Sequence, residues 1–292
     1  MIKRTIDISD GPTYLNIEND QLILTRNRER IASIPCEDVG VLLIDHRQTT
    51  YTHAAMIRLL LRGAVIILCG DDHLPLGILQ PMENNNLHTE RLRAQVAAGV
   101  PLRKRLWRQV VMHKIKGQAM NLPEDHRERR RLLAMATEVK SGDTSNCEGV
   151  AARFYWPALL GKDFRRDPEG AWPNPLLNYG YMVFRAAVAR AIVSAGLHPA
   201  LGLYHSNRNN AFVLADDLVE VFRPRVDRAV VGHLKTGRTG IDREAKAAVL
   251  SLLVEPVTIA GQSGPLMVGL HRMMASLARA FDGTGKSLDL PE

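Results

Sequence analysis

Val39-Gly40-Val41-Leu42-Leu43-Ile44 is a continuous apolar run, and the fold class follows from it. Such a run, bounded by polar residues, is typical of a strand that is buried on both faces. Residues 64–69 repeat the pattern, and residues 51–62 between the two runs have helical spacing. The buried face of this helix is expected to hold Ala54, Ile57, Leu60 and Leu61.

A β-hairpin is predicted upstream of this run. Residues 14–17 and 21–25 alternate apolar and polar side chains on either side of the turn-forming residues 18–20. Alternation around a short polar turn is typical of a hairpin. Together with the two buried strands, it predicts a small β-rich N-terminal domain over residues 1–82.

The sequence changes character at a polar run near residues 81–86, where we expect a linker over 83–90. Helical spacing dominates beyond it, so the predicted fold class is α+β, with a larger all-α domain over residues 91–292. One helix face is expected to hold Leu102, Leu106, Val110, Val111 and Ile115. Further helices are expected at 143–160, 176–195, 211–223 (interrupted at Pro224), 243–254 and 266–281.

The composition is that of an ordinary soluble globular protein: 292 residues, 46% hydrophobic and 24% charged. Its three cysteines form no C-x-x-C pair, which argues against a zinc ribbon or a disulfide framework and favours the reducing cytoplasm. The first residues contain no apolar signal core. The most apolar long stretch, 176–195, contains Arg185 and Arg190, and these charges argue against a membrane span.

Positive charge is concentrated in residues 101–140. This segment holds eleven Lys or Arg and four acids, a balance of +7 that equals the net charge of the whole chain. One interpretation is a solvated helix face with local ion pairs. The other is a surface that binds DNA phosphates. The candidate contact residues are Arg103, Lys104, Arg105, Arg108, Lys114 and Lys116.

Two motifs resemble functional sites but have simpler explanations. Residues 283–287 read Gly-Thr-Gly-Lys-Ser, like the end of a phosphate-binding loop, but Ala280 stands where that motif requires glycine. Asp71-Asp72-His73 directly follows a predicted strand, where aspartate is expected to form a turn. Neither motif predicts a site.

Three separated residues are candidate metal ligands: Glu148, His205 and Glu220. We call them the ligand trio. Two carboxylates and one imidazole can hold a divalent cation and leave positions open for a substrate. Oxygen-rich ligation with one histidine suits Mg²⁺ or Mn²⁺ better than a metal that prefers thiolate ligands.

Each member of the ligand trio has a structural alternative. Ser145 to Glu148 matches a capping box, in which the glutamate binds the cap residue's amide. His205 precedes a polar run and is equally explained as a polar loop residue. Glu220 is equally explained as an acid on a helix face, and Asp217, three residues earlier, shares or replaces its role as a ligand.

At these residues the chain resembles the CRISPR-associated protein one family, the integrase that inserts new spacers into CRISPR arrays. The matching phrases are 148–156, 173–181, 196–205 and 216–224, together with 42–46 and 64–75 in the N-terminal part. The length and the phrase 206–212 look most like the form found in type II systems.

The resemblance implies that Glu148, His205 and Glu220 bind the metal and that the helical domain is catalytic. It implies transesterification, in which a 3′-hydroxyl of a prespacer attacks the CRISPR repeat; with water as nucleophile, the same site is an endonuclease. The implied partners are double-stranded DNA, a second copy of the chain paired through the N-terminal domain, and a dimer of CRISPR-associated protein two. The type II effector nuclease and a DNA-end-binding accessory protein are further candidates.

Two other classes of function fit the residues without the resemblance. One is a stand-alone metal-dependent nuclease that cuts branched DNA in repair. The other is a non-enzymatic DNA-binding scaffold, in which the ligand trio is a capping glutamate, a loop histidine and a helix-face acid. A comparison of joining, cutting and binding, with and without Mg²⁺ or Mn²⁺, separates the three.

Overall fold

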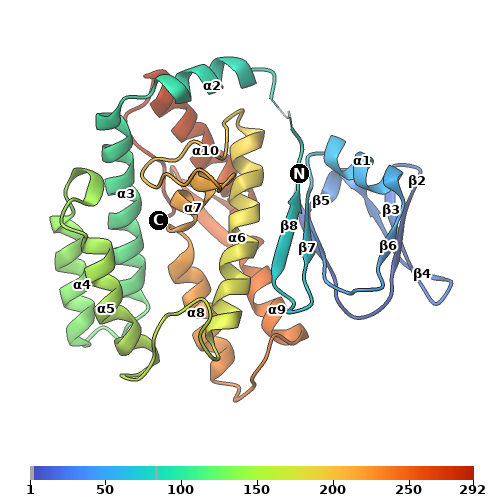
Figure 1. Ribbon diagram of the computed structural model, residues 1–292, viewed down its shortest axis with the longest axis horizontal. Coiled ribbons are helices and arrows are strands. Elements are labelled where there is room, and N and C mark those ends of the chain that lie inside the picture. Colours follow the sequence, from blue (N-terminus) through green and yellow to red (C-terminus); the bar gives the residue numbers. More distant parts are fainter. Residues whose placement is uncertain (1–2, 83–84) are drawn as a thin grey trace.

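The computed structural model describes residues 3–82 and 85–292, and it shows a β-sheet region followed by a mainly helical region (Figure 1). The fold class is therefore α+β, as predicted. The expected linker at 83–90 includes residues 83–84, which lie outside the described residues. The last strand before it ends at Leu79, and the first helix after it begins at His88.

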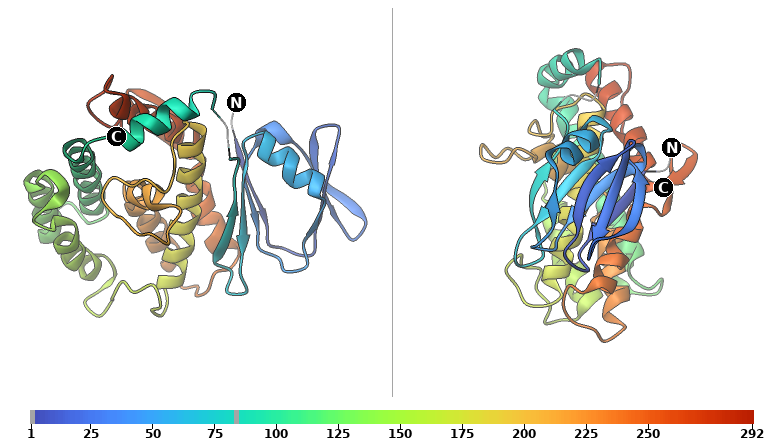
Figure 2. Two further views of the ribbon diagram at one scale, coloured as in Figure 1. Left: turned by 45° about the horizontal axis from the view of Figure 1, so that its top comes forward. Right: turned by 90° about the vertical axis from the view of Figure 1, so that its right-hand side faces the viewer.

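Two four-stranded sheets and one helix make up the N-terminal region (Figure 2). One sheet has the order β1-β5-β7-β8, and the other has the order β4-β3-β2-β6. The predicted hairpin is confirmed as β2 and β3, which pair antiparallel. The bounds are β1 Arg4–Ile8, β2 Tyr14–Glu18, β3 Gln21–Arg26, β4 Glu29–Pro35, β5 Val39–Ile44, β6 Thr50–Tyr51, α1 His53–Leu61, β7 Val65–Cys69 and β8 Pro75–Leu79.

Strand β5 is buried along its whole length because it has core on both faces. Val41 and Leu43 belong to the core of the helical region, whereas Leu42 and Ile44 belong to the core between the two sheets. Its neighbour β7 divides in the same way. This explains why both strands are continuous apolar runs rather than alternating sequences.

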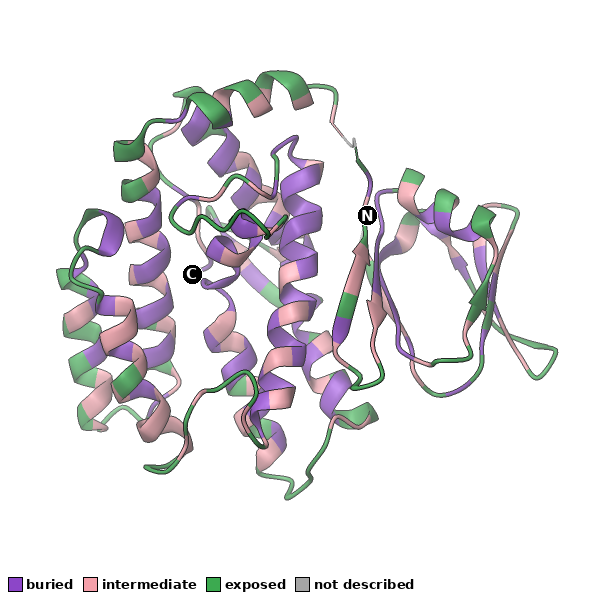
Figure 3. Ribbon diagram, viewed as in Figure 1, coloured by how far each residue is buried: buried purple, intermediate pink, exposed green. Residues whose placement is uncertain are grey.

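The helical region is built around α6, which is buried along most of its length (Figure 3). Helices α7, α8, α9 and α10 pack directly against α6. The bounds are α2 His88–Ala97, α3 Val100–Met120, α4 Arg127–Glu138, α5 Cys147–Leu160, α6 Asn174–Ser194, α7 Val213–Val219, α8 Arg223–Leu234, α9 Arg243–Leu250 and α10 Leu266–Asp282. None of the described helices is long and apolar enough to cross a membrane.

Three predictions about the elements are wrong in detail. The helical region is not all-α, because β9 (Pro256–Ile259) and β10 (Gln262–Pro265) form an antiparallel pair. Helix α1 buries Ala55, Met56 and Leu59 rather than the predicted face. The break in the predicted helix 211–223 falls at residues 220–222, and Pro224 lies in the first turn of α8, where its missing N–H costs nothing.

The two regions are joined by buried polar contacts. The Lys246 ammonium of α9 pairs with the carboxylate of Asp45, and both side chains are almost completely buried. Nε of Arg190 in α6 donates a hydrogen bond of 2.6 Å to the carbonyl oxygen of Gly63. Because a buried charge without its partner is costly, these contacts specify how the regions fit together.

Candidate active site

Glu148 lies in the first turn of α5, and its side chain does not cap the helix. The cap is Asn146, in the left-handed conformation (φ 52°), whose Oδ1 accepts a hydrogen bond of 3.2 Å from the amide of Gly149. The amides of Cys147 and Glu148 donate to Asp143, at 2.8 and 3.0 Å. The capping-box interpretation of Glu148 is therefore wrong, and its carboxylate is left for another partner.

Gly149 leaves room for this cap. A Cβ at this position would lie 2.7 Å from Oδ1 of Asn146, which is closer than a carbon can approach. The cap therefore depends on a residue without a side chain at this position.

Lys114 of α3 bridges two members of the ligand trio. Its Nζ lies 2.6 Å from Oε1 of Glu148 and 2.5 Å from Oε2 of Glu220, and its side chain is only 10% exposed. Burial lowers the pKa of Lys114, but the charges of Glu220 and Glu148 outweigh this effect and leave the pKa above its usual value. The two carboxylates thus converge on one cationic group.

Glu220 occupies the break between α7 and α8, and its side chain is 7% exposed. Arg223, in the first turn of α8, places its guanidinium 3.0 Å from Oε1. Burial raises the pKa of Glu220, but the charges of Arg223 and Lys114 outweigh it and hold the pKa below its usual value. The carboxylate is therefore ionised and paired with two cations of the protein itself.

His205 is held by Asp217, which is completely buried in α7. Nδ1 of His205 lies 2.6 Å from Oδ1 of Asp217. The other oxygen, Oδ2, accepts hydrogen bonds from the amides of Leu203 and Tyr204, at 2.6 and 2.9 Å. Asp217 thus organises the loop that presents the histidine, and it does so with both of its oxygens.

The other contacts of His205 fix its ring. The ring of Trp107 stacks on Tyr204 at 4.8 Å and meets the imidazole edge-on at 5.4 Å. The loop passes so close to α7 at Gly202 that a Cβ there would lie 2.6 Å from Val213 and 2.9 Å from Asp217. The hydrogen bond with Asp217 raises the pKa of His205, and burial opposes that rise.

The side-chain donor atoms of the ligand trio can be compared with those that bind metal ions in proteins. Within residues 3–82 and 85–292, no group of three or more His, Cys, Asp or Glu side chains is arranged to hold a metal ion as it stands. The carboxylates of Glu148 and Glu220 are nevertheless brought together at the Lys114 ammonium. A histidine anchored through one ring nitrogen by a carboxylate is the usual arrangement of a metal ligand. The chemistry of these donors, two carboxylates and one imidazole, therefore suits a divalent cation.

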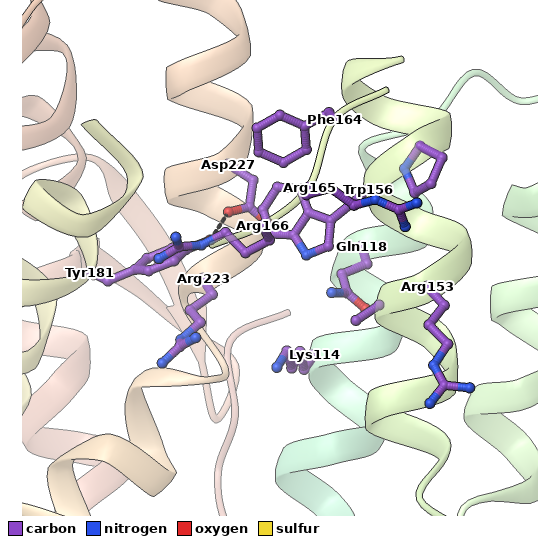
Figure 4. Close-up of a pocket in the computed structure, with 12 residues that line it drawn as sticks. Lys114, Gln118, Arg153, Trp156, Phe164, Arg165, Arg166, Tyr181, Arg223 and Asp227 are labelled. Carbon is purple, nitrogen blue, oxygen red and sulfur yellow. Dashed lines mark hydrogen bonds between the residues drawn. The ribbon is translucent and has the colours of Figure 1, made fainter. Parts of the chain in front are cut away.

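A basic cavity of about 360 Å³ opens beside the ligand trio (Figure 4). Lys114 and Arg223 line it, so it is continuous with the site. Its other lining residues combine positive charge with aromatic rings: Arg153, Arg165, Arg166, Trp156, Phe164 and Tyr181. Five cations around one cavity predict an anionic occupant.

Asp227 is the one acid among the described residues that line the cavity, and it is fully engaged. Its carboxylate accepts hydrogen bonds from the hydroxyls of Tyr155, at 2.8 Å, and Tyr181. Burial raises the pKa of Asp227 to about 6, although both hydroxyls and Arg223 oppose the rise. The cavity therefore offers no free carboxylate to a cation.

The candidate DNA-contact residues divide into three groups. Lys104, Arg105 and Lys116 are exposed. Arg103 and Arg108 are used within the fold, because their guanidinium groups donate to the carbonyl oxygens of Ala98 and Val139. Lys114 is buried in the site itself.

Sequence reasoning missed the role of Lys114 within the site and missed Asp227 altogether. The signal for Lys114 was present: it lies four residues after Val110 and three after Val111, on the apolar face of α3. A lysine on a buried face needs an acidic partner.

The model of the family described as CRISPR associated protein Cas1 matches residues 7–251 of the chain. A CRISPR-associated endonuclease Cas1 of Neisseria meningitidis serogroup C (strain 8013) is 35% identical over 297 residues, covering 100% of this chain and 97% of that protein.

Two solved structures share the fold. A casposase bound to its integration product has a TM-score of 0.78 at 21% identity, covering 99% of this chain and 93% of that one. A Cas6-RT-Cas1–Cas2 complex has a TM-score of 0.77 at 18% identity, covering 97% of this chain and 35% of that one. The likeness extends over both regions of the fold.

Proposed function

As a member of the Cas1 family of CRISPR-associated proteins, this chain is an endonuclease and integrase of spacer acquisition, and we propose that its ligand trio is the catalytic centre. The observation that supports this most directly is the convergence of Glu148 and Glu220 on one cation. They come from two elements 72 residues apart in the chain (220 − 148). Glu220, whose pKa is perturbed by burial and by charged partners beside a basic cavity, is the kind of group that marks a functional site.

The proposed reaction is a transesterification of DNA. The 3′-hydroxyl of a DNA fragment attacks a phosphorus atom at the edge of the repeat, and a new P–O bond forms. The existing P–O bond on the opposite side breaks, and its oxygen leaves with a proton as a free 3′-hydroxyl. Bonds and charges balance, so no nucleotide hydrolysis is needed. With water in place of the hydroxyl, the same exchange cuts the strand.

Endonucleases of this family generally depend on a metal ion. We propose that Glu148, Glu220 and His205 hold Mg²⁺ or Mn²⁺, with Asp217 acting through His205 rather than as a ligand. When bound, the ion would polarise a phosphate oxygen and the attacking hydroxyl. Arg223 is placed to stabilise negative charge on the reacting phosphate, since its guanidinium lies beside Glu220 and lines the basic cavity.

The same cavity supports a role in orienting DNA. Arg166 lies over the ring of Tyr181 at 5.3 Å, and Arg223 lies over the same ring at 4.6 Å, so both guanidinium groups are held in place. Fixed guanidinium groups bind phosphates with defined geometry. We propose that they guide the DNA strand to the ligand trio.

What two proteins of the same fold bind supports a proposal about the partners of this chain. A casposase of the same fold is bound to an integration product, and a Cas1 of the same fold is found with Cas2. We propose that two copies of this chain pair through residues 1–82 and that the domain over residues 91–292 is catalytic. We further propose that two such dimers assemble with a dimer of CRISPR-associated protein two on double-stranded DNA. We assign it to a type II system on the phrase 206–212, with the effector nuclease and an end-binding protein as further partners.

The test uses the full-length protein and a branched DNA that resembles the integration product. We expect Glu148→Ala together with His205→Ala to abolish both strand joining and cutting in Mg²⁺ or Mn²⁺. Glu90→Ala is the matched control, because Glu90 is an exposed acid of α2. Metal-dependent joining that persists in the double variant would overturn the assignment. Cutting without joining in the wild type would favour the repair nuclease.

A further inference from the structure

We propose that Lys114 is an internal counter-ion that occupies the cation position of the ligand trio and must leave it before a metal binds. This inference rests on the proposed metal site. The inference adds that the DNA-free protein binds the metal weakly until DNA provides another partner for Lys114.

The first step is that the two cations cannot share the position. The Lys114 ammonium lies within hydrogen-bond distance of both Glu148 and Glu220. An Mg²⁺ or Mn²⁺ ion bound to the same two oxygens would lie at about 2.0–2.2 Å from each. The ion and the ammonium would then overlap and repel each other, so one replaces the other.

The second step is that the lysine can move without breaking the fold. Its charge is at the end of a flexible four-carbon chain. The side chain also lines the basic cavity, which has a volume of about 360 Å³ (Figure 4). The ammonium can therefore swing from the carboxylates into open space.

The third step is that the cavity gives the displaced ammonium no partner of its own. The one acid in its described lining, Asp227, is already bound by two tyrosine hydroxyls. The remaining charged groups that line it are arginines. A displaced Lys114 would thus lie among like charges until an anion enters, and a DNA phosphate supplies that anion. Metal binding and DNA binding are coupled for this reason.

The test is Mn²⁺ affinity of the DNA-free, full-length protein, measured by calorimetry or by the spin resonance of free Mn²⁺. We expect Lys114→Met to bind Mn²⁺ about tenfold more tightly than the wild type, because the competing charge is gone. Lys235→Met is the control: it removes an exposed lysine at the end of α8, and should leave Mn²⁺ affinity unchanged.

Glu148→Gln separates failure of this inference from failure of the proposed function. If Glu148→Gln weakens Mn²⁺ binding but Lys114→Met binds no more tightly than wild type, the counter-ion role is overturned and the metal site stands. If Glu148→Gln and wild type bind Mn²⁺ equally, both the counter-ion role of Lys114 and the proposed metal site are overturned.

A second measurement needs no substitution at Lys114. Amine labelling followed by mass spectrometry should find Lys114 protected in the metal-free protein, where the residue is 8% exposed. Saturating Mn²⁺ should make it reactive, while Lys246, 3% exposed, stays protected. If Lys114 stays protected in Mn²⁺-saturated protein, the proposal that the metal replaces its ammonium is overturned.

Discussion

The buried carboxylate of Asp217 holds His205 by ring nitrogen and by backbone: Oδ1 lies 2.6 Å from Nδ1 and 3.3 Å from the histidine's own amide nitrogen. A carboxylate so placed orients the imidazole and selects the ring nitrogen that remains for a ligand.

Asp217→Asn should therefore weaken Mn²⁺ binding and strand joining by about 10–100-fold. An asparagine keeps the size of the side chain but turns an N–H group toward the donating amides of the loop. We also expect the free energy of unfolding to fall by about 1–3 kcal/mol. Asp216→Asn is the control, since Asp216 pairs with Arg185 instead. Equal Mn²⁺ affinity in Asp217→Asn and wild type would contradict this role.

The pH dependence of metal binding follows from His205. Its pKa is raised by Asp217, and a metal binds only the neutral imidazole. We expect Mn²⁺ affinity to rise with pH through a midpoint above about 6.5, the usual value for histidine. The free energy of unfolding of the metal-free protein changes in the opposite direction. The contact of protonated His205 with Asp217 stabilises the fold at low pH, and this stabilisation is lost as pH rises through the folded-state pKa of His205.

A pH titration of Mn²⁺ affinity, together with nuclear magnetic resonance of the His205 ring, measures both effects. Asp217→Asn should shift the midpoint to lower pH. A midpoint that stays in place after this substitution would show that another group controls it.

The raised pKa of Asp227 predicts a second pH effect, on the free energy of unfolding. Its pKa is raised from 3.8 to about 6 in the folded protein, so the folded state holds a proton that the unfolded state has released. Its contribution to the free energy of unfolding should fall, by at most about 3 kcal/mol, as pH rises through this window. Chemical unfolding between about pH 4 and 6 should show a larger fall in the free energy of unfolding for the wild type than for Asp227→Asn.

The salt dependence of DNA binding distinguishes the exposed cations from the ones used within the fold. Replacing Lys104 and Arg105 by alanine should lower the slope of log affinity against log salt by about two units, about one for each phosphate contact. Arg103→Ala should have a smaller effect on the slope, because its guanidinium already binds the Ala98 carbonyl. An unchanged slope in the double variant would exclude this end of α3 from the DNA surface.

Strands β5 and β7 were predicted correctly because they have core on both faces. Every residue of β5 is buried, so apolar side chains leave no ambiguity. Helix α1 was misread because its exposed face also holds apolar residues: Ile57 and Leu61 are 44% and 69% exposed. An apolar residue at helical spacing does not reveal which side of the helix meets the core.

The candidate site was predicted in part. Glu148, His205 and Glu220 stand in recognisable local phrases, but the partner that joins two of them is 34 residues from Glu148 and follows no motif. The cap at Asn146 was missed for a different reason. In the sequence, the pair Ser145 and Glu148 matches a helix cap as well as Asn146 does. Only the left-handed backbone at Asn146 shows that the asparagine is the cap.

The buried pair Asp45–Lys246 has a consequence for the history of the chain. The two residues are separated by 201 positions, yet loss of Asp45 would leave Lys246 as an unpaired buried charge, at a cost of about 3–5 kcal/mol. Substitutions at these positions should therefore occur together among relatives. A chimaera that takes its sheet region from one relative and its helical region from another should fold only when both partners of this pair are inherited in matching form.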